Sequence, residues 1–354
     1  MKLNKVREQI AAQFIAALQE EQLPWHAMWH NARPANAITG KKYKGVNTFY
    51  LSLVAEAMGY KDHRWCTFKQ AKDKGWHVKK GEHASPVEYW RLYDKAQKKY
   101  IEWSEANRIT AADPDREKDM ILTCKTYLVF NGDQIEGIPE LNISSAVDIE
   151  AVRAQRDVLL KNMDLDFHEG GTEAFYRPST DSITMPPDTF FVDDYGYMST
   201  FLHECGHATG HESRLKRNIS NFFGTPEYAK EELRAEIASA FTAQALGFGS
   251  NAEDLSGALD NHKAYIQSWI KAIEDQPNEL FAAIKDAEEI SDYLLEKGEF
   301  FKEKEAELDE KEPMDISPEE KHLPLDKQIA LSVAKRSCTQ ASGHERDNLE
   351  HAGF

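Results

Sequence analysis

A short segment at residues 201–211, FLHECGHATGH, restricts what this chain can fold into more than any other stretch. An α-helix advances about 3.6 residues per turn, so His203 and His207 lie on one face, with Glu204 beside the first of them. Two imidazoles at this spacing can bind one metal ion, and the neighbouring carboxylate stands where a proton acceptor is needed. The segment therefore predicts a helix that carries two metal ligands.

A third ligand is expected downstream, because a catalytic zinc site needs three protein ligands and one open position. The segment EELRAEIASAF supplies Glu232 and Glu236, which share a face of a second predicted helix. We predict that Glu232 binds the metal and that Glu236 orients a ligating histidine through its other ring nitrogen, as in the E-x-x-A-[D/N/E] arrangement of several zinc peptidase families. The reverse assignment of the two glutamates stays open at this point.

His211 is a further candidate, but it continues the helix line of His203 and His207. Three ligands at i, i+4 and i+8 span about 12 Å of helix axis, which is too far for one ion. The metzincin pattern would need a histidine two positions later, where Ser213 stands. We therefore leave His211 out of the predicted ligand set.

These residues predict metal-assisted hydrolysis of an amide bond. In such a site zinc lowers the pKa of its bound water towards about 7, and Glu204 would remove a proton and pass it to the leaving amine. His262 or Tyr265 could support the oxyanion, although core packing or surface exposure is the commoner role of such residues. A structural zinc site or a metal-free helix is the alternative for the cluster, but neither explains a glutamate directly after the first histidine.

Length and composition favour a protein of two domains and a tail. The chain has 354 residues, of which 41% are hydrophobic, and no apolar run approaches the roughly 18 residues needed to cross a bilayer. Its N-terminus is typical of an amphipathic helix and not of an export signal. The four cysteines have no close spacing, which favours a reducing compartment. We therefore expect a cytoplasmic protein without a membrane partner.

The predicted elements indicate an α+β fold. Residues 1–140 mix helices with two predicted strands, PVEYWRLYDK and TCKTYLVFN, which are separated by a charged segment, 104–119, that we interpret as a loop. Residues 146–300 combine short strands with several helices and form the second predicted domain. Residues 301–354 are dense in charge and poor in aromatic residues, so we predict an acidic and flexible tail.

Charge differs sharply between the two ends of the chain. Residues 1–100 contain 18 Lys and Arg against 9 Asp and Glu, which leaves 25 against 51 for the remainder. Cations bind phosphates, and planar rings stack on unpaired bases at about 1–3 kcal/mol each, so we predict binding of single-stranded DNA with little sequence preference. A solvated lysine face over a tryptophan-filled core explains this composition equally well. The candidate DNA contacts are Lys41, Lys42, Tyr43, Lys44, Trp65, Lys69 and Trp76.

Several long segments resemble a known family. PANAITGKKYKGVNTFYL, RWCTFKQAKDKGWHVKKGE and PVEYW resemble the N-terminal domain of ArdC-type antirestriction proteins, which is related to the N-terminal part of TraC conjugative primases. The run from DSITMPP through YMSTFLHECGHATGHESRLKRN to YAKEELRAEIASAF resembles the zincin-like metallopeptidase domain of the same proteins. Together they cover roughly residues 5–300.

This resemblance implies a protein, encoded by a plasmid or mobile element, that binds single-stranded DNA and protects incoming conjugative DNA from restriction. It places Zn²⁺ or another divalent metal on His203, His207 and Glu232, and the role of general base on Glu204. In the leading hypothesis the DNA-binding domain brings the zincin to DNA-associated proteins. Two other functions stay open. One alternative is a stand-alone cytoplasmic zinc metallopeptidase whose N-terminal domain selects protein substrates. The other is a DNA mimic whose acidic half occupies the DNA-binding site of a restriction enzyme. Solvation of the surface is, however, the ordinary reason for so many acidic residues.

Overall fold

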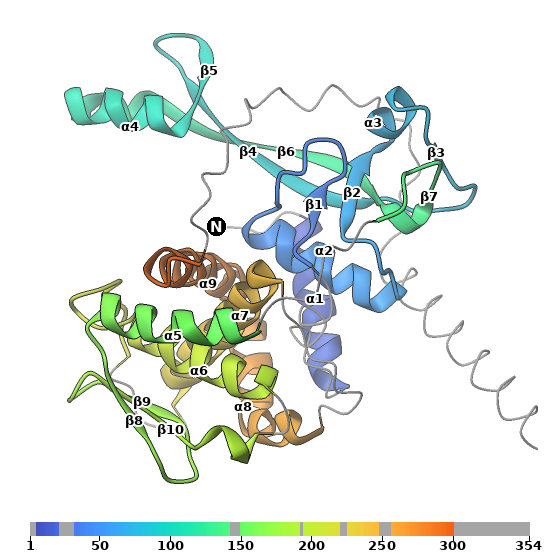
Figure 1. Ribbon diagram of the computed structural model, residues 1–354. Helices are drawn as coiled ribbons and strands as arrows, with labels where there is room; N and C mark the ends of the chain where they lie inside the picture. The colour runs from blue at the N-terminus through green and yellow to red at the C-terminus, as the bar shows by residue number, and fades with distance from the viewer. Residues whose placement is uncertain are drawn as a thin grey trace, which may run out of the picture.

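A computed structural model of the chain describes residues 5–20, 32–141, 149–191, 194–219, 225–247 and 256–300 (Figure 1). Within these ranges helices and strands are mixed, which confirms the predicted α+β class. The charged segment 301–354 lies outside the described residues. None of the helices in these ranges combines the length and the hydrophobicity of a membrane-spanning segment.

The N-terminal part is built on a five-stranded sheet in the order β1-β2-β6-β4-β5. Its strands are β1 (Ala35–Asn36), β2 (Arg64–Thr67), β4 (Ser85–Asp94), β5 (Lys99–Ile101) and β6 (Met120–Asn131). Strands β4 and β6 pair antiparallel, from Ser85 opposite Val129 to Asp94 opposite Met120. They correspond to the two segments predicted as strands, which are rich in β-branched and aromatic residues.

Three helices lie against or beside this sheet, and a pair of short strands completes the N-terminal part. The helices are α1 (Lys5–Gln19), α2 (Gly45–Met58) and α3 (Phe68–Asp73), and the short strands β3 (His77–Val78) and β7 (Ile135–Glu136) pair antiparallel. Helix α2 ends at Gly59, whose φ of 70° lies in the left-handed region that glycine adopts without strain.

The segment 104–119, predicted as a loop, contains helix α4 (Trp103–Ala112) followed by a 3-10 helix, η2 (Pro114–Asp119). Ala106 and Ile109 of α4 pack against Leu92 of β4 and Ile101 of β5. The loop prediction was wrong because two apolar residues in a charged segment are too short a pattern to indicate a helix. Figure 1 shows α4 standing away from the rest of the molecule at the far ends of β4 and β6. We call residues 89–127 the arm.

The C-terminal part combines five helices with a small sheet in the order β8-β10-β9. The helices are α5 (Ile149–Met163), α6 (Asp194–Ala208), α7 (Pro226–Leu246), α8 (Ser256–Asp275) and α9 (Asn278–Lys297). The strands are β8 (Asp166–Glu169), β9 (Phe175–Arg177) and β10 (Ser182–Met185), and β9 is an edge strand that pairs antiparallel with β10. Helix α7 begins after Thr225, whose side chain accepts a hydrogen bond from the Tyr228 N–H at 3.2 Å.

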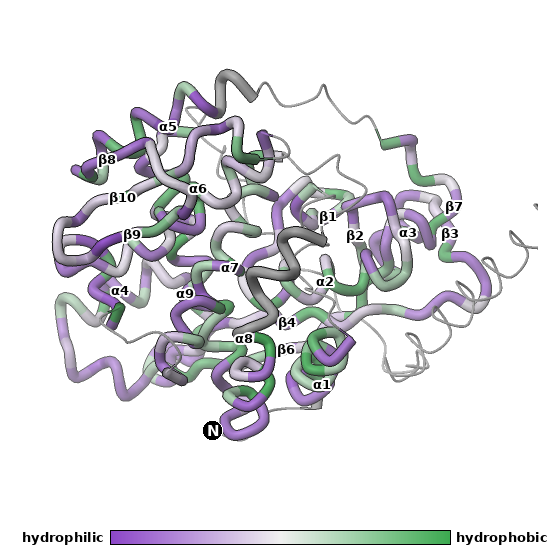
Figure 2. The backbone as a smooth tube through the Cα atoms, turned by 90° about the horizontal axis from the view of Figure 1, so that it is seen from below, coloured by the Kyte–Doolittle hydropathy of each residue, from purple (hydrophilic) through white to green (hydrophobic). Residues whose placement is uncertain are grey.

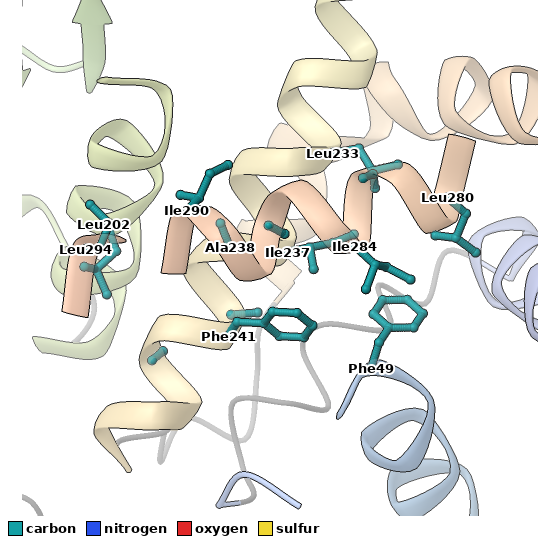
Figure 3. Close-up of a cluster of buried hydrophobic side chains, with 14 of the residues drawn as sticks. Phe49, Leu202, Leu233, Ile237, Ala238, Phe241, Leu280, Ile284, Ile290 and Leu294 are labelled. Atoms are coloured by element: carbon teal, nitrogen blue, oxygen red, sulfur yellow. The ribbon is translucent and has the colours of Figure 1, made fainter. Parts of the chain in front are cut away.

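One hydrophobic core runs through both parts of the chain. Figure 3 shows Phe49 of α2 beside Phe241 of α7 and Ile284 of α9, and all three are fully buried. Figure 2 shows hydrophobic stretches of α1 and α8 side by side, and these two helices are in contact. The packing is therefore continuous between the N-terminal and C-terminal parts. The domain boundaries 1–140, 146–300 and 301–354 stay a prediction.

A buried ion pair also joins the two parts. Arg33, just before β1, donates to one carboxylate oxygen of Glu288 on α9. The second oxygen of Glu288 accepts the backbone N–H of Gly45 at 3.0 Å. Arg33 additionally donates to the carbonyl oxygen of Tyr43 at 3.0 Å. One carboxylate from α9 therefore holds two points of the segment that leads into α2.

Candidate metal centre

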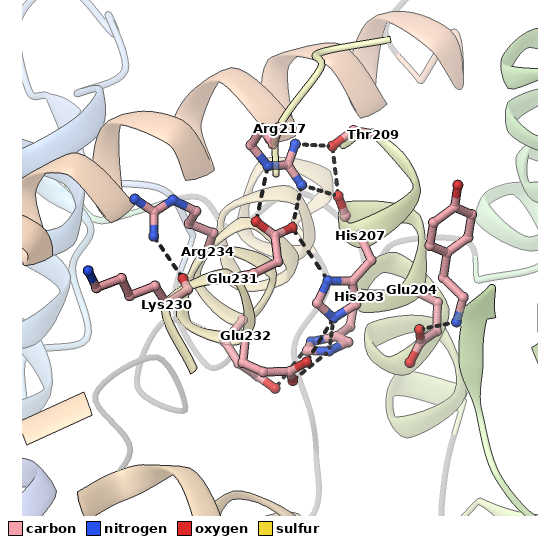
Figure 4. Close-up of polar contacts among 12 residues, drawn as sticks. His203, Glu204, His207, Thr209, Arg217, Lys230, Glu231, Glu232 and Arg234 are labelled. Atoms are coloured by element: carbon pink, nitrogen blue, oxygen red, sulfur yellow. Dashed lines mark hydrogen bonds and ion pairs between the residues drawn. The ribbon is translucent and has the colours of Figure 1, made fainter. Parts of the chain in front are cut away.

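The centre is formed where helices α6 and α7 cross. Gly206 of α6 packs against Ala235 of α7, where a Cβ on Gly206 would make ordinary van der Waals contact with the Ala235 Cα at 3.5 Å. Small residues at a helix crossing allow the two axes to approach, which brings side chains on either side of the crossing together. The histidines of α6 and the glutamates of α7 therefore meet in one buried cluster (Figure 4).

Three side chains of this cluster direct ligand atoms towards a common point. The Nε2 atoms of His203 and His207 are 3.0 Å apart, and Glu232 oxygens lie 3.5 Å and 3.3 Å from them. All three ligand atoms lie within 4.8 Å of one another. Donors at about 2.0–2.2 Å from a tetrahedral ion are roughly 3.4 Å apart, so these residues fit a divalent metal ion. The structure thus brings together the three predicted ligands.

A second layer of carboxylates holds the far nitrogens of the two rings. His203 Nδ1 lies 3.2 Å from Glu236 Oε1, in the orienting position predicted for Glu236. His207 Nδ1 lies 3.5 Å from Glu231 Oε1, a residue that the sequence analysis missed. Each imidazole is therefore fixed by a different carboxylate of α7, which orients its Nε2 towards the ligand cluster.

Glu231 is in turn held by Arg217, which the sequence analysis also missed. The Arg217 guanidinium donates to Glu231 at 2.7 Å and to the carbonyl oxygen of Gly206 at 2.8 Å. It also donates to the hydroxyl of Thr209 at 2.6 Å. Arg217 thereby ties the end of α6 to α7. For Glu231 the available signal was the first glutamate in EELRAE, directly before Glu232.

The close contacts between histidines and glutamates shift the pKa values of the cluster. Burial lowers the pKa of His207, but hydrogen bonds to Glu231 and Glu232 outweigh it and raise that pKa to about 9. Burial likewise opposes protonation of His203, yet Glu236 and Glu232 hold its pKa well above the usual value. Burial raises the pKa of Glu232, whereas hydrogen bonds from both histidines bring it far below its usual range. A metal ion held by His203, His207 and Glu232 would compete with these protons, so its affinity should rise with pH.

Glu204 contacts the edge strand of the small sheet. Its carboxylate is buried and accepts the backbone N–H of Tyr176 in β9 at 2.7 Å. The Tyr176 hydroxyl donates to Asp181 at 2.7 Å, and Asp181 also pairs with Arg214. Figure 4 shows the Glu204 carboxylate turned towards this strand, beside the imidazole cluster. The predicted proton acceptor therefore joins the ligand helix α6 to the edge strand β9.

Of the two residues predicted to support an oxyanion, the structure describes the side chain of Tyr265 alone. His262 belongs to α8, but its side chain lies outside the described residues. Tyr265 stacks on Trp269, with ring centroids 5.9 Å apart, and its ring lies 5.9 Å from that of Tyr228. Tyr228, which the sequence analysis missed, stands one turn before Glu232 on α7. Burial and the nearby Glu232 carboxylate raise the pKa of its hydroxyl, so a tyrosine hydroxyl is present beside the ligands.

The predicted DNA contacts do not form one surface of exposed rings. Lys41, Lys42 and Lys44 are exposed, while the side chains of Tyr43, Lys69 and Trp76 are half-buried. Trp65 has an exposed fraction of 0% and packs edge-on against Tyr60, with ring centroids 6.1 Å apart. The prediction that Trp65 contacts DNA was wrong, because β2 lies between β1 and β6 and its indole fills the core.

Fold and site together define a zincin-like metallopeptidase domain, and residues 154–286 match the family of that description. Residues 4–130 match the N-terminal domain of the anti-restriction factor ArdC. Two crystal structures of the antirestriction ArdC protein from the R388 plasmid are similar over nearly their whole length. The metal-free structure has a TM-score of 0.63 and 29% sequence identity, and the match covers 85% of this chain and 100% of that one. The Mn(II)-bound structure has a TM-score of 0.62 and 31% identity, and the match covers 84% of this chain and 98% of that one. The chain belongs to the ArdC family of antirestriction proteins.

The chain is also similar in sequence to two primases and to one further bacterial protein. Two DNA primases TraC of Escherichia coli are 40% and 37% identical over 295 residues, which is 81% of this chain but only 20% and 27% of theirs. The chain thus spans about a quarter or less of the primases it matches. An uncharacterised protein of Sinorhizobium fredii, y4eC, is 32% identical over 82% of this chain and 91% of its own length.

The outer carboxylates give a testable expectation for metal binding. Replacing Glu231 by glutamine should weaken zinc binding about 10- to 100-fold, because His207 loses the charged partner that orients its ring. Chelator competition on the metal-free protein measures this affinity. Glu227→Gln is the matched control, since Glu227 lies on the same helix but is exposed. Equal affinities of the two variants would show that Glu231 has no part in metal binding.

Proposed function

We propose that this protein is an antirestriction protein that binds single-stranded DNA, protects incoming conjugative DNA and carries a zinc-dependent peptidase-type site. The observation that carries the proposal is that an ArdC-type N-terminal domain and the ligand cluster of α6 and α7 share one hydrophobic core. The same arrangement extends over the solved ArdC protein, because the match covers 100% and 98% of its two structures.

Charge supports the DNA-binding part of the proposal. Lys41, Lys42 and Lys44 are exposed on the segment before α2, where Gly40 turns the chain with a φ of 71°. Cations on such a turn can contact phosphates without reading base edges, so binding should depend on salt and little on sequence. Lys69 and Trp76 are half-buried and are therefore weaker candidates for contact.

The geometry of the ligand cluster supports the hydrolytic part. His203, His207 and Glu232 would hold Zn²⁺, which when bound supplies Lewis acidity and makes water more acidic. Glu204, directly after the ligand His203 on α6, would accept the proton, and its carboxylate is held by the backbone N–H of Tyr176 in β9. DNA-associated proteins are the proposed substrates, because the N-terminal part would bring the site to DNA.

Fluorescence anisotropy tests the DNA-binding proposal directly. A labelled single strand should bind more tightly than the same sequence as a duplex, and its affinity should fall as salt rises because phosphate contacts release counterions. A lack of binding at low salt would reject the DNA function and favour a stand-alone metallopeptidase whose N-terminal domain selects proteins. A truncated chain ending at residue 300 tests the DNA-mimic alternative, because an acidic mimic should lose activity without residues 301–354.

A further inference from the structure

One face of the arm is left uncovered by α4. Leu92 of β4 pairs with Ile101 of β5 and with Leu122 of β6, so these three side chains project from the same face. Helix α4 packs on that face through Ala106 and Ile109. Because side chains alternate along a strand, the neighbours of Leu92, Ile101 and Leu122 project from the opposite face.

Strand register gathers tyrosines and cations on this opposite face. Tyr93 stands opposite Tyr100, and Tyr89 stands opposite Lys125. Arg91 stands opposite Thr123, whose hydroxyl donates to the Arg91 carbonyl oxygen at 3.1 Å. We call this surface the tyrosine face. Its residues are Tyr89, Arg91, Tyr93, Tyr100, Ile121, Thr123, Lys125 and Tyr127.

The aromatic rings of the tyrosine face form two pairs, and each pair has a cation–π contact with a basic side chain. Tyr93 and Tyr100 meet edge-on, with ring centroids 5.3 Å apart, and Tyr89 and Tyr127 do so at 5.9 Å. The Arg91 guanidinium lies 3.9 Å from the centroid of Tyr100. The Lys125 ammonium lies 5.3 Å from that of Tyr127. The register places these two ring pairs, each with its own cation, one after the other along the face as a strip. At its inner end Tyr89 and Tyr127 pack against the hydrophobic core, and Tyr127 is only 7% exposed.

The outer part of this strip is accessible to a ligand. Tyr100 is 46% exposed and Ile121 is 38% exposed, while Lys125 is also exposed. None of the eight residues is acidic. The two carboxylates of β4, Glu88 and Asp94, alternate onto the other face, where they pair with Arg7 and Arg116 respectively. The strip thus offers rings and positive charge, which complement a nucleic-acid strand.

We propose that the tyrosine face is the surface on which single-stranded DNA stacks its bases, an inference that rests on the proposed single-strand binding. Unpaired bases present flat faces that stack on aromatic rings, whereas a duplex keeps its bases inside. Arg91 and Lys125 stand within the strip, where phosphates between successive bases would pass. Sequence analysis placed the ring contacts at Tyr43, Trp65 and Trp76, but an exposed ring with an adjacent cation, Tyr100 beside Arg91, belongs to the arm.

Substitutions in the full-length protein test the assignment. Tyr100→Ala should weaken binding of a labelled thymidine strand about 5- to 150-fold, whereas Tyr100→Phe, which keeps the ring, should retain most of the affinity. Lys125→Gln should reduce the slope of log affinity against log salt by about one. Two controls should bind like the unchanged protein. Leu122→Ala removes an exposed side chain from the opposite face of the arm, and Phe190→Ala removes an exposed ring outside it.

The outcomes separate this inference from the proposed function. No binding by the unchanged protein would reject single-strand binding altogether. Tight binding by the unchanged protein and equal binding by Tyr100→Ala would overturn the tyrosine face alone. Photocrosslinking with a bromodeoxyuridine strand gives a second readout that does not depend on substitutions. Crosslinks on peptides containing Tyr93 and Tyr100 are expected, and crosslinks confined to residues 41–44 would contradict the assignment.

Discussion

Replacing Glu204 by glutamine is expected to lower peptide hydrolysis by about 10²- to 10⁴-fold while zinc stays bound, because an amide cannot accept the proton. The substitution preserves shape. In the structure Glu204 Oε2 accepts the Tyr176 N–H at 2.7 Å, and an amide oxygen can accept the same hydrogen bond. Cleavage of a quenched fluorescent peptide library, measured together with the zinc content of each protein, checks both parts of this expectation.

Glu212→Gln is the matched control for this experiment, since Glu212 is exposed shortly after the end of α6. Unchanged hydrolysis by the Glu204 variant would exclude Glu204 as the proton acceptor. A variant that lost its zinc would show instead that Glu204 maintains the centre. Protection of conjugative DNA in cells by the same variant then separates the two proposed activities: protection that survives without hydrolysis does not depend on the peptidase-type chemistry.

Replacing Arg33 by methionine is expected to destabilise the fold by about 3–5 kcal/mol, because the change leaves the Glu288 carboxylate buried without its ionic partner. The two side chains are only 7% and 11% exposed, so water cannot easily replace the lost partner. The remaining hydrogen bond from the Gly45 N–H, at 3.0 Å, is a weaker partner than a guanidinium. Urea unfolding followed by tryptophan fluorescence measures the loss.

A second ion pair between the same parts of the chain supplies the control. Lys44 and Asp292 are 67% and 50% exposed and 3.3 Å apart, so Lys44→Met should cost no more than about 1 kcal/mol. The double variant Arg33→Met with Glu288→Leu should recover much of the stability, because no charge is then left buried. If Arg33→Met were as mild as Lys44→Met, the buried pair would not contribute to joining the two parts.

The metal centre shows how far sequence reasoning reached. Spacing within one helix depends only on local backbone geometry, so His203 and His207 could be paired from the sequence. Glu232 required knowledge that α7 crosses α6, and it was placed through a motif known from peptidase families. Glu231 and Arg217 were missed because their role arises from the closeness of the crossing at Gly206, which no local pattern indicates.

In the N-terminal part, sequence reasoning assigned a DNA contact wrongly, at Trp65. Lysine and aromatic content fitted nucleic-acid binding and a solvated lysine face over an aromatic core equally well, because composition cannot distinguish a buried ring from an exposed one. Trp65 is buried because its side of β2 faces the hydrophobic core, whereas Tyr100 is exposed because it projects from the face of the arm opposite to α4. Only strand order and register decide such differences, since a shift of one residue would turn every side chain to the other face.

The sequence by itself determined the ligand pair of α6, the neighbouring Glu204, the two long strands and the mixed α+β class, because each depends on periodicity over a few residues. The tertiary structure alone decided which carboxylates orient the histidines, that Arg33 and Glu288 join the two parts, and that tyrosines from three strands form one face. These features depend on contacts between residues far apart in the chain, whose closeness is set by packing and strand register.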